Sequence, residues 1–320
     1  KSIKLGIAFA SVDIIIKSME ELLEYLETNY ADKQPTLKQY KNHFKRLQII
    51  NPDLNNYTEC IDCLKDLDNS LSQKLGLLNL IIIYTSRIKN VDMDKDTHPL
   101  FIFRNELKNE ELLNKVSKNE ILKTQLPDRD TLHKFMNNEF KKSNFKNYIV
   151  NYLLLNFNVR NADCNVRIFK NQDPCVDDIN YMVFYNDKPD YVVYKRNKYK
   201  TSNIYGKQEH KIMAKGIAGK NLCNAVREIY DINDGKNNEG VPLFKTTNGL
   251  QVSDTNCGWY VANSTYQGIG EGKYLKIILN DINNKPNTMN ILNRISASRG
   301  TGAKHLITDY NITQSVNDIL

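Results

Sequence analysis

Two short segments carry the side chains with the clearest potential for chemistry. The first, residues 151–163 (NYLLLNFNVRNAD), is an apolar run that we expect to form a helix ending at a turn, which presents Arg160 and then Asp163. The second, further along the chain, reads RNKYKTSNIYG and carries Lys198 and Lys200. Arginine holds phosphate oxygens in a rigid planar fork, whereas lysine is a mobile charge that can give up a proton. Together the segments predict a site that grips and protonates a phosphodiester.

These motifs resemble those of the tyrosine recombinases, the phage integrase family. LLLNFNVRNAD is similar to the family's first arginine box, in which an apolar helix ends in Gly-x-Arg-x-x-Glu; Asn158 stands for the glycine and Asp163 for the glutamate. KYKTSNIYG resembles the lysine turn between two strands of the family's catalytic domain. PTLKQYKNHFKRL (35–47) resembles the first helix of its core-binding domain. The three pieces occur in the family's order, and the resemblance spans residues 30–320.

The resemblance implies DNA strand cleavage and rejoining without a metal or cofactor. In this family a tyrosine attacks the scissile phosphate and forms a 3′-phosphotyrosyl link, while two arginines stabilise the charge on the non-bridging oxygens. A lysine protonates the departing 5′-oxygen. The resemblance makes Arg160 the first arginine and Lys200, or Lys198 in a shifted register, the acid.

The second arginine box departs from the family's pattern. The family has His-x-x-Arg on a helix, and NTMNILNRISASRG lies at that place. With Leu292 in its usual position, Asn290 replaces the histidine and Asn293 the arginine, and asparagine supplies no positive charge. A shift of one residue offers Arg294 as the second arginine, and Arg299 is a further candidate.

We expect the nucleophilic tyrosine to lie beyond Leu320. Tyr310 follows the second box more closely than the family's tyrosine does, and we expect it to be a packing or surface residue. The sequence does not begin with Met, so we expect a piece of a longer protein that lacks the last helices of the catalytic domain. Such a piece should form no covalent adduct with DNA.

The composition fits an intracellular protein. The longest apolar run, LGLLNLIIIY, is well below the roughly 18 residues that a membrane span requires, and the N-terminal segment lacks a signal-peptide cleavage site. We therefore expect neither a membrane nor secretion. The many Lys, Asn and Ile residues indicate an AT-rich genome, such as that of a virus or mobile element, and hence a host cytoplasm or nucleus.

The net charge of +7 is modest and on its own would fit simple solubility. The charge is concentrated in residues 195–220, where lysines alternate with tyrosines, a pattern suited to a phosphate backbone. We expect duplex DNA as the partner, bound by a homo-oligomer. The residues predicted to contact DNA are Lys38, Lys41, Lys45, Lys195, Arg196, Lys198 and Lys207.

The six cysteines do not predict a metal site. Cys60 and Cys63 form a C-x-x-C pair within a helical pattern, and no second pair lies at zinc-ligand spacing. We expect free thiols in a reducing compartment, no metal and no cofactor.

The predicted fold is mainly α with a small antiparallel β-sheet, an α+β class. We expect a helical core-binding domain over residues 1–125 and a recombinase-like catalytic domain over residues 126–320. Thr36 is a predicted N-cap in the first domain, and Asp128 or Asp130 is expected to cap the first helix of the second. Helices are predicted over 12–30, 36–47, 57–67, 70–88, 104–123, 130–139, 144–156, 219–231 and 273–280. Strands are predicted over 181–186 and 190–197, which form a hairpin, and at 210–213, with a short connector over 241–244.

Two other interpretations stay open. The asparagines of the second box suggest a catalytically degenerate relative that acts as a DNA-binding or virion/nucleoprotein structural factor. The basic hairpin would also be compatible with a helical protein-interaction subunit whose lysines are merely solvated.

Overall fold

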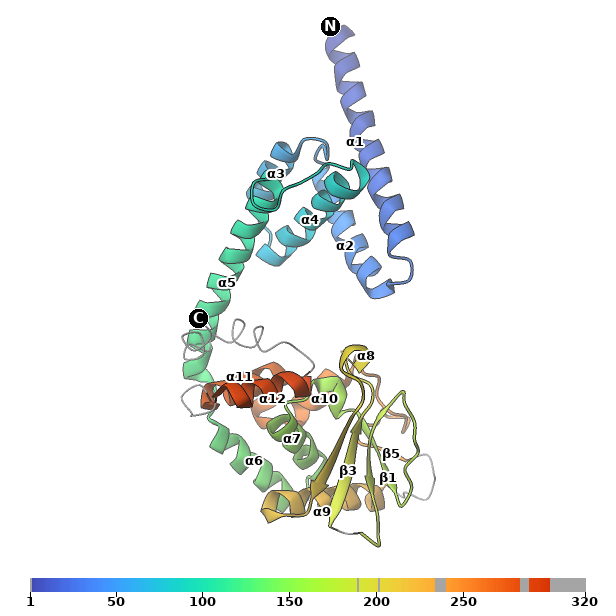
Figure 1. Ribbon diagram of the computed structural model, residues 1–320, viewed down its shortest axis with the longest axis vertical. Coiled ribbons are helices and arrows are strands. Elements are labelled where there is room, and N and C mark those ends of the chain that lie inside the picture. Colours follow the sequence, from blue (N-terminus) through green and yellow to red (C-terminus); the bar gives the residue numbers. More distant parts are fainter. Residues whose placement is uncertain (1, 189, 201, 234–239, 283–287, 300–320) are drawn as a thin grey trace. The chain divides into compact units, whose positions relative to one another are not determined.

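The chain folds into two compact units, residues 1–117 and 118–320, each with its own hydrophobic core. In the described residues the first unit is helical and the second combines helices with a five-stranded sheet (Figure 1). This confirms the predicted α+β class. The computed structural model describes residues 2–188, 190–200, 202–233, 240–282 and 288–299.

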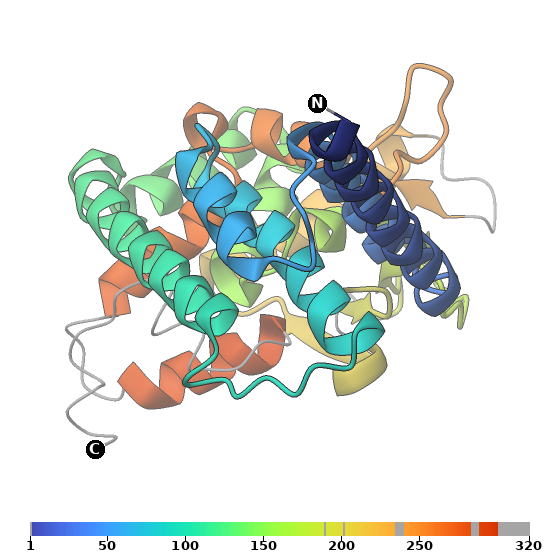
Figure 2. The same cartoon turned by 90° about the horizontal axis from the view of Figure 1, so that it is seen from above.

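The N-terminal unit is a bundle in which α4 packs against α2 and α3, and α1 packs against α2 (Figure 2). Leucines from α1, α2 and α4, among them Leu26, Leu47 and Leu77, are fully buried in its core. The helices are α1 (Ser2–Asn29), α2 (Gln34–Ile50), α3 (Tyr57–Asp66), α4 (Leu71–Ile83) with a π-helical turn η1 (Tyr84–Ile88), and α5 (Pro99–Gln125). The division between the units falls within α5, and the predicted boundary at residue 125 coincides with the end of this helix.

Helix α2 begins earlier than the sequence suggested. Thr36 was predicted as its N-cap, but the helix starts at Gln34 and Thr36 lies inside it. Lys33 occupies the N-cap position and makes no side-chain capping bond. Pro35 explains the difference, because proline is pre-organised for the first helical turn and the helix therefore starts before it.

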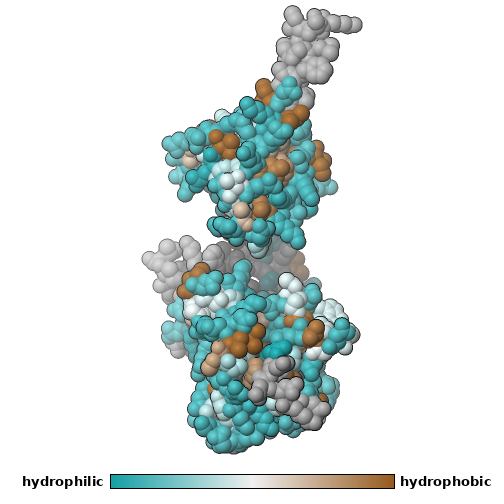
Figure 3. Space-filling model, turned by 90° about the vertical axis from the view of Figure 1, so that its right-hand side faces the viewer, coloured by the Kyte–Doolittle hydropathy of each residue, from teal (hydrophilic) through white to brown (hydrophobic). Residues whose placement is uncertain are grey.

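The C-terminal unit is built around α7, which contacts α6, α9, α10 and α11. Seven residues of α7 are buried, including Tyr148, Leu153 and Leu154. The helices of this unit are α6 (Arg129–Lys141), α7 (Phe145–Phe157), α8 (Ser202–Tyr205), α9 (Gly216–Ile232), α10 (Cys257–Ser264), α11 (Glu271–Ile282) and α12 (Thr288–Arg299), with 3-10 turns η2 (Asn161–Cys164) and η3 (Tyr266–Gly268). Figure 3 shows a mostly hydrophilic surface with small, scattered hydrophobic areas. None of the described helices is long and apolar enough to cross a membrane.

The sheet of this unit is mixed, with the strand order β4-β3-β2-β1-β5. Its strands are β1 (Val166–Lys170), β2 (Asn180–Phe184), β3 (Tyr191–Arg196), β4 (Gln208–Met213) and β5 (Val241–Pro242). The predicted β2–β3 hairpin and the strand at 210–213 are confirmed, and these three strands are antiparallel. The expectation of a purely antiparallel sheet is wrong, because β1 pairs with β2 in parallel. The predicted connector at 241–244 begins with β5, which pairs with β1.

The start of α6 provides a test of helix capping. Asp128 is the N-cap, and its carboxylate accepts a hydrogen bond of 2.6 Å from the amide of Thr131. We expect Asp128→Ala to lower the free energy of unfolding by about 1 kcal/mol, because the amide loses its acceptor. Asp130→Ala, in the same turn, removes only the favourable charge of an exposed side chain near the helix N-terminus and should cost about 0.3 kcal/mol. Urea denaturation measures both changes; an equal or larger loss for Asp130→Ala would contradict the assignment.

Candidate functional site

Arg160 is positioned by a sharp turn at the end of α7. Asn158 caps the helix in the left-handed conformation, with φ 52° and ψ 38°, which asparagine tolerates better than most residues. Val159 is buried, and Arg160 is the N-cap of the 3-10 turn η2. The amide of Arg160 donates a hydrogen bond of 2.9 Å to Oδ2 of Asp163. The predicted arrangement of helix, turn and arginine is therefore present, with Asp163 fixing the turn.

Asp163 also forms a buried ion pair with Arg196. The two side chains are 1% and 0% exposed, and Nη2 of Arg196 lies 2.5 Å from Oδ2 of Asp163. Arg196 also donates to Oε1 of Gln208 at 3.0 Å, and its guanidinium lies 4.3 Å from the centre of the Tyr199 ring. This burial corrects the prediction that Arg196 contacts DNA, since its side chain is enclosed by protein groups.

The side chains of β3 point alternately to the two faces of the sheet, and for this reason Lys195 and Arg196 have different surroundings. Adjacent residues of a strand point to opposite faces, so only Arg196 points toward Asp163. On the other face Lys195 pairs with Asp173 at 2.6 Å and with Glu209 at 3.3 Å. Burial alone would raise the pKa of Asp173, but hydrogen bonds from Lys195 and Tyr181 outweigh it and lower that pKa to about 2. Lys195, a predicted DNA contact, is thus held by two carboxylates.

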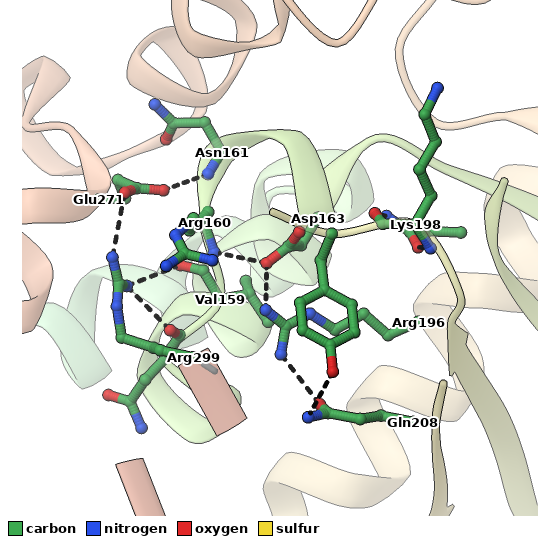
Figure 4. Close-up of polar contacts among 12 residues, drawn as sticks. Val159, Arg160, Asn161, Asp163, Arg196, Lys198, Gln208, Glu271 and Arg299 are labelled. Atoms are coloured by element: carbon green, nitrogen blue, oxygen red, sulfur yellow. Dashed lines mark hydrogen bonds and ion pairs between the residues drawn. The ribbon is translucent and has the colours of Figure 1, made fainter. Parts of the chain in front are cut away.

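The ends of α11 and α12 approach the same turn (Figure 4). Arg299, the last residue of α12, donates from Nη1 to the carbonyl oxygens of Asn158 at 2.9 Å and Val159 at 3.4 Å. Its Nη2 lies 3.2 Å from Oε1 of Glu271, the first residue of α11. Glu271 in turn accepts a hydrogen bond from the amide of Asn161. The turn that carries Arg160 is therefore held by Asp163 from within and by Glu271 and Arg299 from the other side.

The cluster has an excess of positive charge. The guanidinium groups of Arg160, Arg196 and Arg299 outnumber the carboxylates of Asp163 and Glu271 by one. Burial and the charge of Arg299 lower the pKa of Arg160, while the two carboxylates oppose this shift. Nη1 of Arg160 is buried and has no hydrogen-bond partner among the described residues. No acceptor among the described residues uses this donor, so it keeps an unused hydrogen-bonding capacity beneath the surface of the cluster.

The two cysteines beside this turn are not suited to nucleophilic chemistry. Cys164 ends η2, and burial raises its pKa well above the ordinary value. The thiol of Cys257 donates to the carbonyl oxygen of Asn161, and burial raises its pKa to about 12. Buried thiols of this kind stay protonated and inert at neutral pH.

The lysines after β3 differ in their pairing. Lys198 lies 3.1 Å from Asp254 and points away from the arginine cluster (Figure 4). Lys207 pairs with Asp177 at 2.6 Å. Lys200 is exposed, and no ion pair involves it in the part of the chain that the structure describes. Of these three lysines, Lys200 is the one that forms no ion pair with a carboxylate of the described residues.

The candidates on α12 separate into two groups. Asn290, Asn293 and Arg294 are exposed, and Arg294 lines a pocket of about 630 Å³ together with His210 and Gln208. Arg299 is 8% exposed and is the one that interacts with Arg160. Sequence reasoning favoured Arg294, whereas the packing of α12 brings the alternative, Arg299, to the turn.

The lysines predicted to contact DNA in the N-terminal unit lie on one side of α2. Lys38, Lys41 and Lys45 are spaced by three and four residues, which places them on one helix face. Lys38 and Lys45 are exposed, while Lys41 pairs with Glu27 at 2.6 Å. Tyr310, the tyrosine predicted not to be the nucleophile, lies outside the described residues.

Sequence reasoning missed Glu271 and Gln208. A helix was predicted over 273–280, and the helix instead begins two residues earlier, at Glu271 itself. A glutamate in a first helical turn is common and favourable, so its type gave no signal of a second role. Its partner Asn161 is 110 residues away in the sequence.

The buried ion pair predicts a large effect on stability. Arg196→Met should lower the free energy of unfolding by about 3–5 kcal/mol, because Asp163 is left as a buried, uncompensated charge. Lys198→Met, two residues away, breaks an exposed pair and should cost less than about 1 kcal/mol. Urea denaturation of both variants measures the difference, and a small effect for Arg196→Met would show that Asp163 finds another partner or takes up a proton.

His210 predicts a pH dependence of stability. Its ring packs against Phe157 and Tyr194, and burial, followed by the charge of Arg196, lowers its pKa. The unfolded chain therefore binds this proton at a higher pH than the folded chain. The contribution of His210 is present above an unfolded pKa of about 6.5 and is lost as the pH falls below it. We expect His210→Gln to flatten the fall in stability between pH 7 and pH 5. Titration of the His210 ring by NMR checks the shift, which a pKa of 6.5 or more would contradict.

The comparisons with known proteins are sparse. No protein-family model matches the chain, and no curated protein matches it in sequence. Among solved structures, the crystal structure of XerA recombinase is similar to 95% of this chain over 98% of its own length, with a TM-score of 0.36 and 11% sequence identity.

Proposed function

We propose that this chain binds duplex DNA and cleaves and rejoins its strands through a covalent tyrosine, as its recombinase-like motifs imply. The observation that carries the proposal is the unpartnered Nη1 of Arg160, held at a fixed turn within a cluster that has one excess positive charge. A guanidinium donor in such surroundings fits a non-bridging phosphate oxygen.

In the proposed reaction, a tyrosine oxygen forms a bond to phosphorus as the bond between phosphorus and the 5′-oxygen breaks. The tyrosine gives its proton to water, and the departing 5′-oxygen gains one from a lysine. Rejoining reverses both transfers, with the 5′-hydroxyl as the attacking group. We do not assign the nucleophile to Tyr310, because it is too near the second box in the sequence.

Within this proposal Arg160 contacts the phosphate, and Arg299 supports it with a second charge. Lys200 is assigned as the acid in preference to Lys198, since the ammonium of Lys198 already bonds to Asp254. The exposed lysines of α2, Lys38 and Lys45, are assigned to DNA contacts by the N-terminal unit. We further propose that copies of the chain assemble on DNA.

A second candidate function is DNA binding without cleavage. The guanidinium of Arg299 is engaged by two backbone carbonyls and Glu271, so little of it is left for a phosphate. Asn290 and Asn293 occupy the positions of the family's histidine and second arginine and carry no charge. A chain of this kind would hold DNA through Arg160 and surface lysines in a structural role.

Duplex binding is the first expected result. Affinity for a duplex should fall steeply as salt rises, because phosphate contacts release counterions. Fluorescence anisotropy at several salt concentrations measures the slope of log affinity against log salt. Lack of affinity at low salt, or a slope near zero, would overturn both candidate functions and favour a protein-interaction role.

Variants of Arg160 distinguish the two candidate functions. In the natural protein, Arg160→Ala should lower the rate of covalent adduct formation on a nicked suicide duplex by about 10²–10³-fold, because a preorganised charge contact is lost. Arg160→Lys keeps the charge but lacks the planar fork, so we expect an intermediate rate. Duplex affinity should change little in both variants. An unchanged rate in Arg160→Ala would make Arg160 structural, and tight duplex binding with no adduct from the parent protein would select the second candidate.

A further inference from the structure

Two neighbouring apolar side chains project from the basic turn after β3. Ile204 is 76% exposed and Tyr205 is 50% exposed, and both lie on the short helix α8 between β3 and β4 (Figure 1). A single exposed isoleucine is ordinary on a protein surface. Here an exposed aliphatic and an exposed aromatic residue are consecutive in the part of the sequence with the densest positive charge.

The turn below these side chains is closed by its own hydrogen bonds. The hydroxyl of Tyr199 donates to the carbonyl oxygen of Gly206 at 2.7 Å, and the amide of Gly206 donates to the carbonyl oxygen of Ser202 at 2.8 Å. The amide of Ser202 donates back to the carbonyl oxygen of Tyr199 at 3.0 Å. Gly206 has a φ of +73°, which permits the reversal into β4.

This turn is anchored to the arginine cluster. Tyr199 is 6% exposed and lies against the guanidinium of Arg196, which is fixed by the buried Asp163. The side chain of Gln208, the first residue of β4, contacts both Arg196 and the hydroxyl of Tyr199. The base of the turn is thus rigid while its apolar tip faces outward.

Three lysines lie around the tip; two of them are paired with Asp254 and Asp177, and Lys200 has no ion-pair partner among the described residues. Lys198, Lys200 and Lys207 flank α8 in the sequence, and the side chains of Lys198 and Lys207 are 61% and 54% exposed. Lysines attract phosphate groups, and apolar side chains beside them can enter between stacked base pairs. A partner with a polyanionic exterior and an apolar stacked interior matches both features.

We propose that Ile204 and Tyr205 form an apolar wedge that inserts between stacked base pairs of duplex DNA and locally unstacks them. This inference rests on the proposed DNA binding and adds how the duplex is deformed. The lysines bind the phosphate backbone. The rigid turn holds Ile204 and Tyr205 in the position from which they insert between the base pairs. Unstacking at this point would bend the duplex beside the phosphate that Arg160 receives.

The test uses a set of duplexes with 2-aminopurine at successive positions, because unstacking raises the fluorescence of this base. The parent protein should increase fluorescence at one or two adjacent positions. Ile204→Ser should abolish the increase and weaken affinity about tenfold or more, since a large aliphatic side chain loses its buried site. The slope of log affinity against log salt should be the same for Ile204→Ser as for the parent protein. Lys200→Gln should instead lower the magnitude of the slope by about 0.9.

Leu250→Ser is the matched control. Leu250 is 69% exposed at another tight turn of the same unit, closed by a hydrogen bond of 2.8 Å from the amide of Thr246 to the carbonyl oxygen of Leu250. We expect this variant to keep both the fluorescence increase and the affinity. Circular dichroism and urea denaturation verify that all three variants fold as the parent protein does.

The outcomes separate the wedge from the proposed function. Duplex binding without any fluorescence increase, or an increase that persists in Ile204→Ser, overturns the wedge and leaves DNA binding intact. Absence of duplex binding overturns the proposed function itself. Binding to vesicles of anionic phospholipid that is lost in Ile204→Ser, with no effect of this variant on DNA, also overturns the wedge and assigns the tip to a membrane surface.

Discussion

The ion pair between Asp163 and Arg196 is the interaction on which the arrangement of the site depends. Two charges removed from water each cost several kcal/mol unless they meet with good geometry. A single oxygen of Asp163 accepts from both the amide of Arg160 and the guanidinium of Arg196. The end of α7 and the end of β3 are therefore fixed to the same atom. A slip of β3 by one residue would turn Arg196 to the opposite face and leave this carboxylate buried alone.

The local parts of this arrangement were predictable from sequence, and the long-range parts were not. The apolar run of α7, its turn and the β2–β3 hairpin follow from periodicity and turn residues. Arg196 looked like one more cation of a basic surface, because its partner lies 33 residues earlier. The short strand β1 has Arg167 as its second residue and Lys170 at its end and was missed, so the parallel pairing was missed with it.

Not every buried polar group at this site has a hydrogen-bond partner. Among the described residues of the turn, a guanidinium nitrogen of Arg160 is buried without a protein acceptor, and the side-chain oxygens Oδ1 of Asn158, Asn161 and Asp163 are buried without a donor. A buried donor that lacks a partner costs about 1–3 kcal/mol. The surrounding contacts of Asp163, Glu271 and Arg299 offset that cost by holding the turn in place. An anion that reached this nitrogen would relieve the penalty, and because the nitrogen is buried, such binding requires a shift of the Arg160 side chain or of the groups that cover it.

The edges of the sheet have a consequence for how copies of this chain can meet. An unpaired strand edge is a template for strand addition and aggregation, and proteins suppress it with short strands and charged side chains. One edge here is β5, which has only two residues. The other edge is β4, where Glu209 and Lys211 alternate with less exposed neighbours. Growth of the sheet across two molecules is disfavoured at both ends, which directs any association of this unit to its helices and loops.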